Sequence, residues 1–501
     1  MRRKIASESV DLCYIDPPFN SKRNYFQIYN NHGTDDRAQA QAFEDTWEWG
    51  EEANAGLAYI NDVEHLQNGK FTVQTVELIR GLNKVLGNGS LFAYLVHMTL
   101  RIVEIHRALK PTGTFYLHCD PTASHYLKLL IDSIFVPQGG DYLNELIWCY
   151  SQGGRSKSWF PRKHDVIFWY AKGTTWKFND REIRVKYELL SEKSQTSFTK
   201  TDKDGRRYKE IYGPGKHKLY KYYEDEGKIP YDWWTDIHQM TGRTAASGNE
   251  YLGYPTQKPQ ALLERLIKAA SDQDDVILDA YCGCGTTVAV SQKLRRKWIG
   301  IDITYQSISL ILKRLEDQYP EKWDEIAANI QLDGVPRDMA SAVALANRKD
   351  DKIRKEFEKW AVLTYSKNQA RINDKKGADK GIDGIAFFMV DKDKNGKAIL
   401  QVKSGGANRA TMATLNSDRQ RESAEIGILI TMDEPTKSMK EEVLAAGKYR
   451  HPLLDREDDR LKIVTIEEIL SGKRLDLPMG RIDMVKSAEA VVDTSKQLGL
   501  L

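Results

Sequence analysis

The chain has 501 residues, of which 41% are hydrophobic and 29% are charged. This composition is typical of a globular protein and excludes wholesale disorder, a collagen-like fibre and a disulfide scaffold. The 5 cysteines are scattered and suit a reducing cytosol, and Cys282-Gly283-Cys284 has no second Cys or His pair for zinc. The most apolar stretch, residues 91–100, is too short to cross a membrane. We therefore expect a soluble, cytoplasmic protein with several domains.

The net charge of +3 is unevenly distributed. Residues 151–222 hold 18 Lys and Arg against 8 Asp and Glu, a local balance of +10, so the remainder carries −7. Aromatic residues are interleaved with these cations. Basic side chains neutralise phosphates, and aromatic rings stack on bases. The segment is either a nucleic-acid interface or a solvated, lysine-rich surface on a small insert.

Strands and helices are predicted to alternate along the first part of the chain. Residues 10–16 are typical of a buried strand, 91–109 of a helix that ends at Lys110-Pro111-Thr112-Gly113, and 114–118 of the next strand. The other predicted helices are 124–135, 259–270 and 286–294, and the other strands are 144–150, 165–170, 276–279 and 298–302. This order predicts an α/β fold whose mostly parallel sheet has helices on both faces.

A second α/β unit is predicted over residues 351–480, after a polar linker at 321–350 and before a tail at 481–501. It opens with an amphipathic helix at 353–364, and Asn395-Gly396 is a hairpin turn signal. The predicted strands are 384–390, 398–403, 426–431 and 461–466, with helices at 411–424 and 438–446.

Asp16-Pro17-Pro18-Phe19 follows the first strand, at the sheet edge where open α/β sheets place ligands. Proline fixes φ and stiffens the turn. The Asp16 carboxylate and a main-chain carbonyl can then accept hydrogen bonds from one exocyclic NH₂ group, and Phe19 can stack on the ring that bears it. The alternative is a turn that only ends the strand.

A glycine-containing turn over residues 279–287 joins a predicted strand to a helix. Glycines let the backbone approach a ligand closely. Asp302 ends the next predicted strand, where α/β nucleotide sites place a carboxylate on ribose hydroxyls. The turn lacks the third glycine of the dinucleotide fingerprint, so NAD is the lesser interpretation.

These motifs resemble the β group of amino-methylating DNA methyltransferases, which act on adenine N6 or cytosine N4. Residues 16–19 are similar to the catalytic motif of that family, 279–287 to its S-adenosylmethionine motif and 254–259 to the segment that precedes it. Residues 109–113 and 116–120 resemble further blocks. The likeness covers roughly residues 8–315 and implies a Rossmann-like fold. It implies a catalytic half at 1–150, a target-recognition insert at 151–250 and a cofactor-binding half at 251–320.

The resemblance implies a role for each matching residue. Asp16 and the Pro17 carbonyl hold the target amine, Pro18 completes the motif, and Phe19 stacks on the flipped base. A base inside a duplex cannot reach such a pocket, so it must be flipped out. The residues implied at the S-adenosylmethionine site are Thr256, Lys258, Asp279, Tyr281, Gly283, Gly285, Thr286 and Asp302. Thr256 and Lys258 lie near the methionine end, and Asp302 holds the ribose.

The double-stranded DNA is expected to lie on the basic insert, with Arg206, Arg207 and Lys209 as contacts. In one respect the chain differs from the family. Its members usually carry a further strand and an acidic turn before the catalytic motif, and residues 1–9 show no such element. We expect one side of the adenine pocket for the cofactor to be missing or rebuilt.

The second unit carries residues that suit a metal ion. Asp383 enters one predicted strand, and Gln401 and Lys403 share a face of its partner strand, since strand side chains alternate. Asp383 and Gln401 can supply oxygens to Mg²⁺, and Lys403 can stabilise developing charge, while Glu358 on the preceding helix adds a carboxylate. This pattern resembles the PD-D/E-x-K nuclease fold, most closely its Mrr-type restriction branch. The alternative is a degenerate nuclease fold kept for DNA binding or partner contact.

The leading hypothesis is a site-specific DNA methyltransferase with a fused nuclease-like module, in a restriction-modification or defence context. Adenine N6 is favoured, because cytosine N4 methylases more often carry Ser in place of Asp16. The alternatives are a cytosine N4 methyltransferase and a DNA-binding module whose sites are degenerate. The oligomeric state is left open, with a homodimer as one candidate.

Overall fold

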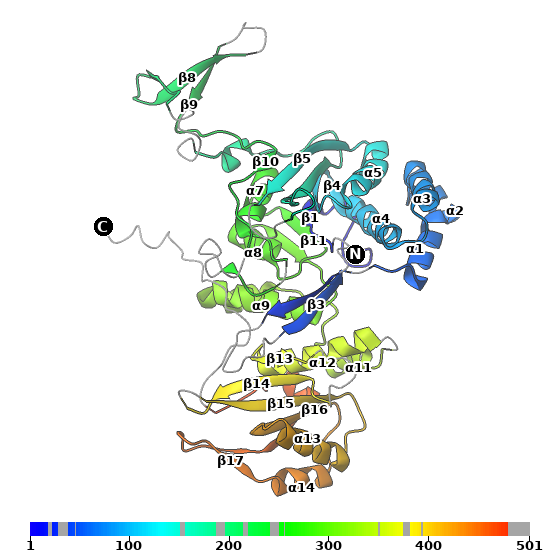
Figure 1. The fold of residues 1–501 in the computed structure, drawn as a ribbon, viewed down its shortest axis with the longest axis vertical. Helices are drawn as coiled ribbons and strands as arrows, with labels where there is room; N and C mark the ends of the chain where they lie inside the picture. Colours follow the sequence, from blue (N-terminus) through cyan, green and yellow to red (C-terminus); the bar gives the residue numbers. More distant parts are fainter. Residues whose placement is uncertain are drawn as a thin grey trace.

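The computed structural model describes residues 1–18, 23–28, 39–45, 47–150, 156–186, 196–213, 219–240, 250–254, 256–348, 351–373, 381–391 and 394–478. These residues form two α/β bodies stacked along the long axis of the molecule (Figure 1). A narrow β-arm projects from the first body, at the end far from the second.

Seven strands form the sheet of the first body, in the order β10-β5-β6-β4-β1-β11-β12. They are β1 (Val10–Ile15), β4 (Leu109–Cys119), β5 (Asp141–Cys149), β6 (His164–Ala171), β10 (Trp233–Trp234), β11 (Val276–Asp279) and β12 (Lys297–Gly300). Neighbouring strands run parallel except where β6 meets β4 and β5. The prediction of a mostly parallel sheet is confirmed.

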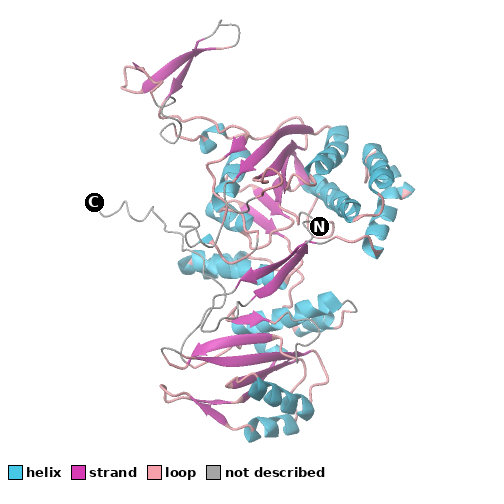
Figure 2. Ribbon diagram, viewed as in Figure 1, coloured by secondary structure: helices cyan, strands magenta, loops and turns pink. Residues whose placement is uncertain are grey.

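Helices cover both faces of this sheet (Figure 2). One face packs on α4 (Ser90–Ala108) and α5 (Ser124–Phe135), with α1 (Glu51–Asn61), α2 (Val63–Gln67) and α3 (Val73–Leu86) further out. The other face packs on α7 (Gln260–Ala270). Cys13 and Ile15 of β1 lie in the first apolar cluster, and Leu12 and Tyr14 lie in the second. Every residue of β1 is buried, as expected for a central strand covered on both faces.

The carboxyl ends of three adjacent strands meet at one edge of the sheet. Since β1 lies between β4 and β11, Asp16, Asp120 and Asp279 come together there at or just beyond the ends of the strands. Ligands of open α/β sheets bind at this edge. From here the chain continues through the glycine turn into α8 (Thr286–Lys293) and, after β12, into α9 (Tyr305–Gln318).

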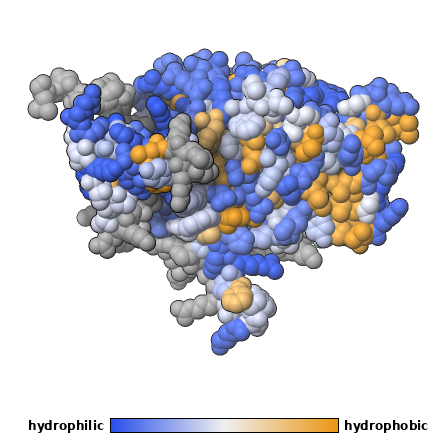
Figure 3. All heavy atoms as spheres, turned by 90° about the horizontal axis from the view of Figure 1, so that it is seen from above, coloured by the Kyte–Doolittle hydropathy of each residue, from blue (hydrophilic) through white to orange (hydrophobic). Residues whose placement is uncertain are grey.

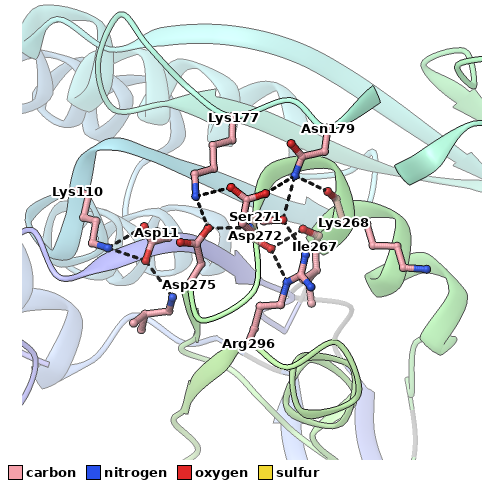
Figure 4. A network of polar contacts seen from close by, with 11 residues as sticks. Asp11, Lys110, Lys177, Asn179, Ile267, Lys268, Ser271, Asp272, Asp275 and Arg296 are labelled. Atoms are coloured by element: carbon pink, nitrogen blue, oxygen red, sulfur yellow. Dashed lines mark hydrogen bonds and ion pairs between the residues drawn. The ribbon is translucent and has the colours of Figure 1, made fainter. Parts of the chain in front are cut away.

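A polar network closes the opposite, amino-terminal edge of the sheet (Figure 4). Both carboxylate oxygens of Asp11 accept hydrogen bonds from Lys110 Nζ at 2.8 Å, and Oδ2 also accepts from the Val276 N–H at 2.9 Å. Nearby, Lys177 Nζ binds Asp275 at 2.6 Å. These contacts fix the starts of β1, β4 and β11 relative to one another.

Between β6 and β10 the chain leaves the central sheet, forms the β-arm and then returns to the sheet. Its strands are β7 (Lys200–Thr201), β8 (Arg207–Tyr212) and β9 (Leu219–Tyr223), joined as an antiparallel sheet. The exposed large apolar side chains of these strands are Ile211, Tyr212, Leu219, Tyr220 and Tyr222. A separate two-stranded sheet, β2 (Arg23–Ile28) with β3 (Gln39–Asp45), follows the Asp16 motif.

Five strands form the sheet of the second body, in the order β13-β14-β15-β16-β19. They are β13 (Ala370–Ile372), β14 (Gly384–Met389), β15 (Asn395–Lys403), β16 (Ile426–Thr431) and β19 (Leu461–Thr465). Helix α12 (Asp351–Ser366) packs on one face, and α13 (Arg409–Arg421) and α14 (Lys437–Ala445) pack on the other. A two-stranded sheet of β17 (Lys448–Arg450) and β18 (Glu457–Asp459) and helix α15 (Ile466–Leu470) complete this body.

The structure corrects the predicted hairpin turn of the second unit. Asn395 and Gly396 pair with Met389 and Phe388 in the β14–β15 ladder, so the turn lies before them. A Cβ at Gly396 would lie 2.5 Å from the Phe388 ring, so this glycine gives room to an aromatic side chain instead of making a turn.

Two other boundaries differ from the predictions. β4 begins at Leu109 and runs through the predicted Lys110–Gly113 stop, because it pairs with β1 at Leu109 and again from Thr114, with a shift of register between the two. The predicted linker contains α10 (Trp323–Asn329) and α11 (Met339–Ala346), after a 3-10 turn at Pro320–Lys322. Ala342 and Ala346 of α11 are buried in the apolar core of the second body.

Apolar surface gathers on the helical side of the first body. Seen from above, orange atoms cluster on the side where α1 to α5 lie in Figure 1 (Figure 3). The exposed large apolar residues there are Tyr59, Val63, Val73, Val85, Leu129 and Val136. Among the described residues, none of the helices has the length and hydropathy needed to cross a bilayer.

Candidate active site

Asp16, at the end of β1, forms an ion pair with a lysine from a distant part of the chain. Its Oδ2 accepts a hydrogen bond from Lys258 Nζ at 2.6 Å. Its Oδ1 is buried and has no hydrogen-bond partner among the described residues. A buried carboxylate oxygen without a donor is costly, so this oxygen marks a position suited to an N–H group of a ligand.

The glycine turn has a backbone that only glycine adopts easily. The φ values of Gly283 and Gly285 are 48° and 72°, in the left-handed region. A Cβ at Gly285 would lie 2.5 Å from Ile311 Cγ1, and one at Gly283 would lie 3.3 Å from the Tyr254 ring. These two positions therefore favour glycine both for their φ values and for the close packing of the turn against Ile311 and Tyr254.

Asp302 is hydrogen-bonded to this turn. Its Oδ2 accepts from the Gly283 N–H at 3.1 Å, and its Oδ1 accepts from both the N–H and the hydroxyl of Thr304 at 3.0 Å. Thr304 is also the N-cap of α9, where its hydroxyl accepts from the Ser307 N–H. Ile303, between them, is 89% exposed. The strand end, the glycine turn and the start of α9 thus form one connected loop with a single apolar side chain pointing outward.

Asp279 is the most deeply buried carboxylate of the site. Its Oδ1 accepts from the Tyr281 N–H at 3.0 Å, and its Oδ2 accepts from the Thr287 hydroxyl at 2.6 Å. Burial, together with the charges of Asp16 and Asp302, raises the pKa of Asp279 to about 7. Burial also raises the pKa of Asp302. Carboxylates that repel one another in this way favour a cationic ligand.

The segment before α7 connects to the same turn. The Thr286 hydroxyl donates to the Lys258 carbonyl at 3.3 Å, and the buried Arg314 donates to the carbonyl of Cys284 at 3.3 Å. Thr256 is exposed, and its φ of 62° is unusual for a β-branched residue. Backbone strain of this kind often occurs at ligand sites. Lys258, which the sequence placed near a methionine end, lies against the Asp16 carboxylate.

The Tyr281 side chain points away from the turn toward α4. Its hydroxyl lies 2.9 Å from His97 Nε2. Burial raises the pKa of Tyr281 to about 12, and burial with the nearby Arg101 charge lowers the pKa of His97 to about 3. Both side chains are therefore neutral near pH 7, and Tyr281 anchors the turn to α4.

A buried polar chain below Asp16 was missed by the sequence reasoning. Tyr14 Oη lies 2.9 Å from His118 Nδ1, and His118 Nε2 lies 3.1 Å from Asp165 Oδ2. Tyr150 donates its hydroxyl to the other Asp165 oxygen at 3.1 Å. Burial alone would raise the pKa of Asp165, but its bonds to His118 and the Lys258 charge lower it. The sequence signal for this polar chain is the block at 116–120, which contains His118 and resembles a motif of the family.

The basic residues proposed to contact DNA lie on the arm and have partners within it. Arg206 donates to Asp225 at 2.8 and 2.9 Å and to Glu226 at 3.2 Å. Arg207 pairs with Glu224 at 3.0 Å. The remaining residue of the set, Lys209, donates to Ser197 Oγ at 3.2 Å. Ion pairs of this kind hold the arm together, so DNA contacts by the two arginines would have to compete with them.

In the second body, Asp383 and Gln401 lie where β14 begins beside β15. Asp383 Oδ2 accepts from the Val402 N–H at 2.7 Å, and Gln401 Oε1 is buried without a hydrogen-bond partner among the described residues. Lys403 and Gln401 share the face of β15 that is covered by α13 and α14, since Ile399 lies in that cluster. Glu358 belongs to α12 on the opposite face. Within the described ranges, no group of three His, Cys, Asp or Glu side chains could hold a metal.

The structure therefore brings together most of the residues singled out in the first body. Asp16, Pro17 and Pro18 lie at the carboxyl end of β1, and the residues gathered around them are Lys258, Asp279, Gly283, Gly285, Thr286 and Asp302. Thr256 lies beside them in sequence. Phe19, the residue expected to stack on the base, is outside the described residues.

The chain is similar to known DNA-modifying proteins. Residues 354–471 match a family model described as NACHT-associated inactive Restriction Endonuclease 1, which confirms the restriction-endonuclease-like character of the second body. Among curated relatives, Type II methyltransferase M.BglII from Bacillus subtilis is 28% identical over 228 residues, which are 43% of this chain and 57% of that protein. Type II methyltransferase M2.LlaDCHI from Lactococcus lactis subsp. cremoris is 38% identical over 212 residues, or 41% of this chain and 61% of that protein.

DNA adenine methyltransferase YhdJ from Escherichia coli (strain K12) is 28% identical over 217 residues, 43% of this chain and 64% of that protein. The chain thus spans somewhat more than half the length of these relatives. A solved structure titled PvuII DNA methyltransferase (cytosine-N4-specific) is 14% identical with a TM-score of 0.34, and covers 66% of this chain and 90% of that one. A family model described as DNA methylase matches residues 10–313, more than half of the sequence. The chain belongs to this DNA methylase family.

Proposed function

We propose that the protein transfers a methyl group from S-adenosylmethionine to an exocyclic amine of a DNA base, adenine N6 in the first instance. The observation that carries this proposal is the state of Asp16. One carboxylate oxygen is held by Lys258, and the other is buried without a hydrogen-bond partner among the described residues. An amine hydrogen of an extruded base suits that oxygen, because the carboxylate is already fixed in orientation.

The residues around the glycine turn fit S-adenosylmethionine, which carries a positive sulfonium. Burial first, and then the charges of Asp16 and Asp302, raise the pKa of Asp279 to about 7, and the nearness of these three carboxylates supports a cationic ligand. In the proposed complex, Asp302 accepts hydrogen bonds from the ribose hydroxyls, and the exposed Ile303 packs on the adenine ring. The turn at Gly283 and Gly285 borders the amino-acid end.

In the proposed reaction, Asp16 accepts a hydrogen bond from one N–H of the amine and orients it. The main-chain carbonyl of Pro17 accepts a hydrogen bond from the second N–H. When bound, S-adenosylmethionine supplies a methyl group that passes directly to nitrogen as its bond to sulfur breaks, and S-adenosylhomocysteine is left as the neutral thioether. The amine becomes cationic as it is methylated, and the Asp16 carboxylate stabilises that charge until the amine releases a proton to water. Lys258 keeps Asp16 in place throughout, since the two lie 2.6 Å apart.

Double-stranded DNA is the proposed substrate, and the compartment we propose is the cytoplasm. The β-arm supports a DNA partner, because it combines exposed tyrosines with the basic range of the chain and projects away from the body (Figure 1). Base pairing blocks the amine within a duplex, so the target base must be flipped into the pocket.

For the second body we propose a role other than DNA cleavage. Asp383 already uses one oxygen for the Val402 N–H, and Gln401 is neutral. An engaged carboxylate and a neutral amide make a weak site for Mg²⁺, which is held mainly by charged carboxylates and phosphates and fills its other positions with water. The matching family model is described as an inactive restriction endonuclease, which supports the same proposal.

The test is transfer of radiolabelled methyl groups to duplex DNA of mixed sequence, followed by nucleoside analysis. We expect N6-methyladenine as the product. Label found in N4-methylcytosine would change the proposed target base from adenine to cytosine and would leave the proposed reaction unchanged. DNA binding without label, while S-adenosylmethionine is bound, would reject transfer and favour a DNA-binding module with a degenerate site.

A further inference from the structure

The two bodies share one apolar core where α12 meets α9. Leu252, Tyr254, Cys284 and Leu310 come from the first body, and they belong to the same buried cluster as Phe357 and Trp360 of α12. Tyr254 in this cluster is the residue whose ring borders Gly283. The second body is therefore packed against the back of the proposed donor site.

Hydrogen bonds cross this interface at the first turn of α9. The Tyr305 N–H donates to Glu356 Oε2 of α12 at 2.6 Å, and the Tyr305 hydroxyl lies 2.9 Å from Thr364 Oγ1. Further along, Asn368 Nδ2 donates to the Ser309 carbonyl at 3.3 Å. The amino end of a helix carries unpaired N–H groups and partial positive charge, so the Glu356 carboxylate stabilises this turn.

The helix turn held by Glu356 is continuous with the Asp302 loop. Thr304, the residue before Tyr305, donates both its N–H and its hydroxyl to Asp302. Asp302 in turn accepts from the Gly283 N–H. A continuous chain of contacts thus runs from α12, through the start of α9, to the glycine turn.

We propose that Glu356 is a positioning residue for the donor site, supplied by the restriction-endonuclease-like body. It holds the first turn of α9 so that Asp302 presents its carboxylate to the ribose. The inference rests on the proposed function, because it assumes that this loop binds S-adenosylmethionine. It also gives the second body a task that needs no cleavage of DNA.

Coupling of this kind is reciprocal. If docking of α12 strengthens donor binding, the donor must strengthen docking of α12 by the same factor. Bound S-adenosylmethionine should therefore slow hydrogen exchange of the amides in residues 302–308 and in α12, since local opening of both becomes rarer.

The experiment titrates S-adenosylmethionine into the full-length protein by calorimetry. Glu356→Ala should raise the Kd about fivefold, and Glu356→Gln, which keeps an acceptor, should restore most of the affinity. The matched control is Asp351→Asn on the same helix, whose side chain is 77% exposed and paired within α12 to Arg354. It should leave the Kd unchanged. At saturating donor, the transfer rate and the KM for DNA should equal those of the wild type in every variant.

Each outcome decides between the two proposals. Wild-type protein that binds no S-adenosylmethionine would reject the proposed function, and with it the role of Glu356. A Glu356→Ala protein that folds and binds the donor as tightly as wild type would reject the positioning role alone. Should Glu356→Ala fail to fold, Thr364→Val takes its place, with a rise in Kd of about twofold expected. An unchanged Kd and unchanged exchange of residues 302–308 in Thr364→Val would also reject it.

Discussion

At the residue scale, the site depends on where two carboxylates find hydrogen-bond donors. Asp302 has three donors from the loop around it, whereas Asp16 has one donor, on one of its two oxygens, among the described residues. Asp302 is therefore held in a fixed orientation by the loop, whereas Asp16 keeps one oxygen for a new donor. In the proposed function, Asp302 is the fixed acceptor for the ribose and Asp16 is the acceptor for the target amine.

The first prediction concerns Asp16. Asp16→Ala should reduce methyl transfer at least about a hundredfold, because it removes the acceptor that orients the amine and stabilises its charge. S-adenosylmethionine should still bind. The measurement is labelled methyl transfer to DNA beside calorimetry of the donor. Undiminished transfer would refute the role of Asp16, and lost donor binding would instead give the turn a structural role.

The second prediction is a pH dependence set by Asp279. In the free protein its pKa is raised to about 7, so the carboxylate is mostly protonated at pH 6 and mostly ionised at pH 8. If the cationic donor needs the ionised form, its apparent Kd should fall about tenfold between pH 6 and pH 8. Calorimetry at several pH values measures this. Asp279→Asn should bind the donor weakly at every pH, with no such slope.

The same group affects stability with a definite sign. Its pKa is 3.8 in the unfolded reference and about 7 in the folded chain, so the folded state holds the proton more tightly. Its contribution to the free energy of unfolding therefore falls as pH rises from about 4 to about 7 and is constant above that. At pH 8, the donor-free Asp279→Asn protein should unfold at a higher temperature than the wild type. A lower midpoint would contradict the raised pKa.

At the element scale, most of the first sheet was predictable from sequence, whereas the arm and the hairpin turn of the second body were not. β1 and β4 have apolar patterns that a proline follows within two residues, β11 leads into the glycine turn and α8 leaves it, and the type of each was predicted correctly. The hairpin in the second body was misplaced because Gly396 signals a turn by composition but in fact faces a phenylalanine ring. Sequence alone does not distinguish a glycine needed for φ from one needed for space.

The candidate site likewise contains contacts that the sequence predicts and contacts that it does not. The glycine turn and Asp302 are close in sequence, and their arrangement followed from the strand-turn-helix pattern. The ion pair of Asp16 with Lys258 joins residues 242 apart, and His118 is 47 residues from Asp165. Such contacts depend on the order of strands in the sheet, which periodicity does not reveal.

The third prediction tests the network at the amino-terminal edge of the sheet. Asp11→Ala should lower the free energy of unfolding by about 1–3 kcal/mol, since it leaves Lys110 and the Val276 N–H without this acceptor. The urea midpoint measures the effect. The matched control is Asp333→Ala, which breaks an exposed ion pair with Lys4 and should cost less than about 0.5 kcal/mol. Equal losses of unfolding free energy in the two variants would mean that the network does not fix the strands.

The fourth prediction concerns the β-arm. Replacing residues 199–226 by a Gly-Ser linker of about four residues should weaken DNA binding and flatten its dependence on salt, because fewer counterions are released. The slope of log K against log salt should fall by about 2 or more. Donor binding, measured by calorimetry, serves as the control for folding and should not change. An unchanged salt slope would place the DNA elsewhere on the molecule.

At the scale of the whole molecule, the two bodies are joined more closely than a linker would join them. α11 lies within the stretch predicted as a linker, yet its Ala342 and Ala346 are buried in the second core, and that core extends to Tyr254 beside the glycine turn. Two domains that are joined only by a flexible linker are expected to have separate apolar cores. The interface therefore supports a joint task for both bodies.

The last prediction is that the second body does not cut DNA. Unmethylated and methylated DNA should both stay intact across a titration of Mg²⁺ and Mn²⁺ into the millimolar range. The physical reason is the ligand set, in which Asp383 shares its carboxylate with the Val402 N–H and Gln401 offers only a neutral oxygen. Cutting that requires metal and disappears in both Asp383→Ala and Lys403→Ala, while methylation persists, would overturn this and establish a nuclease site at these residues. Cutting that survives Asp383→Ala would place a nuclease site elsewhere in the chain. In the absence of cutting, Glu356→Ala should still weaken donor binding, because the effect of the second body on the first acts through α9 and needs no metal.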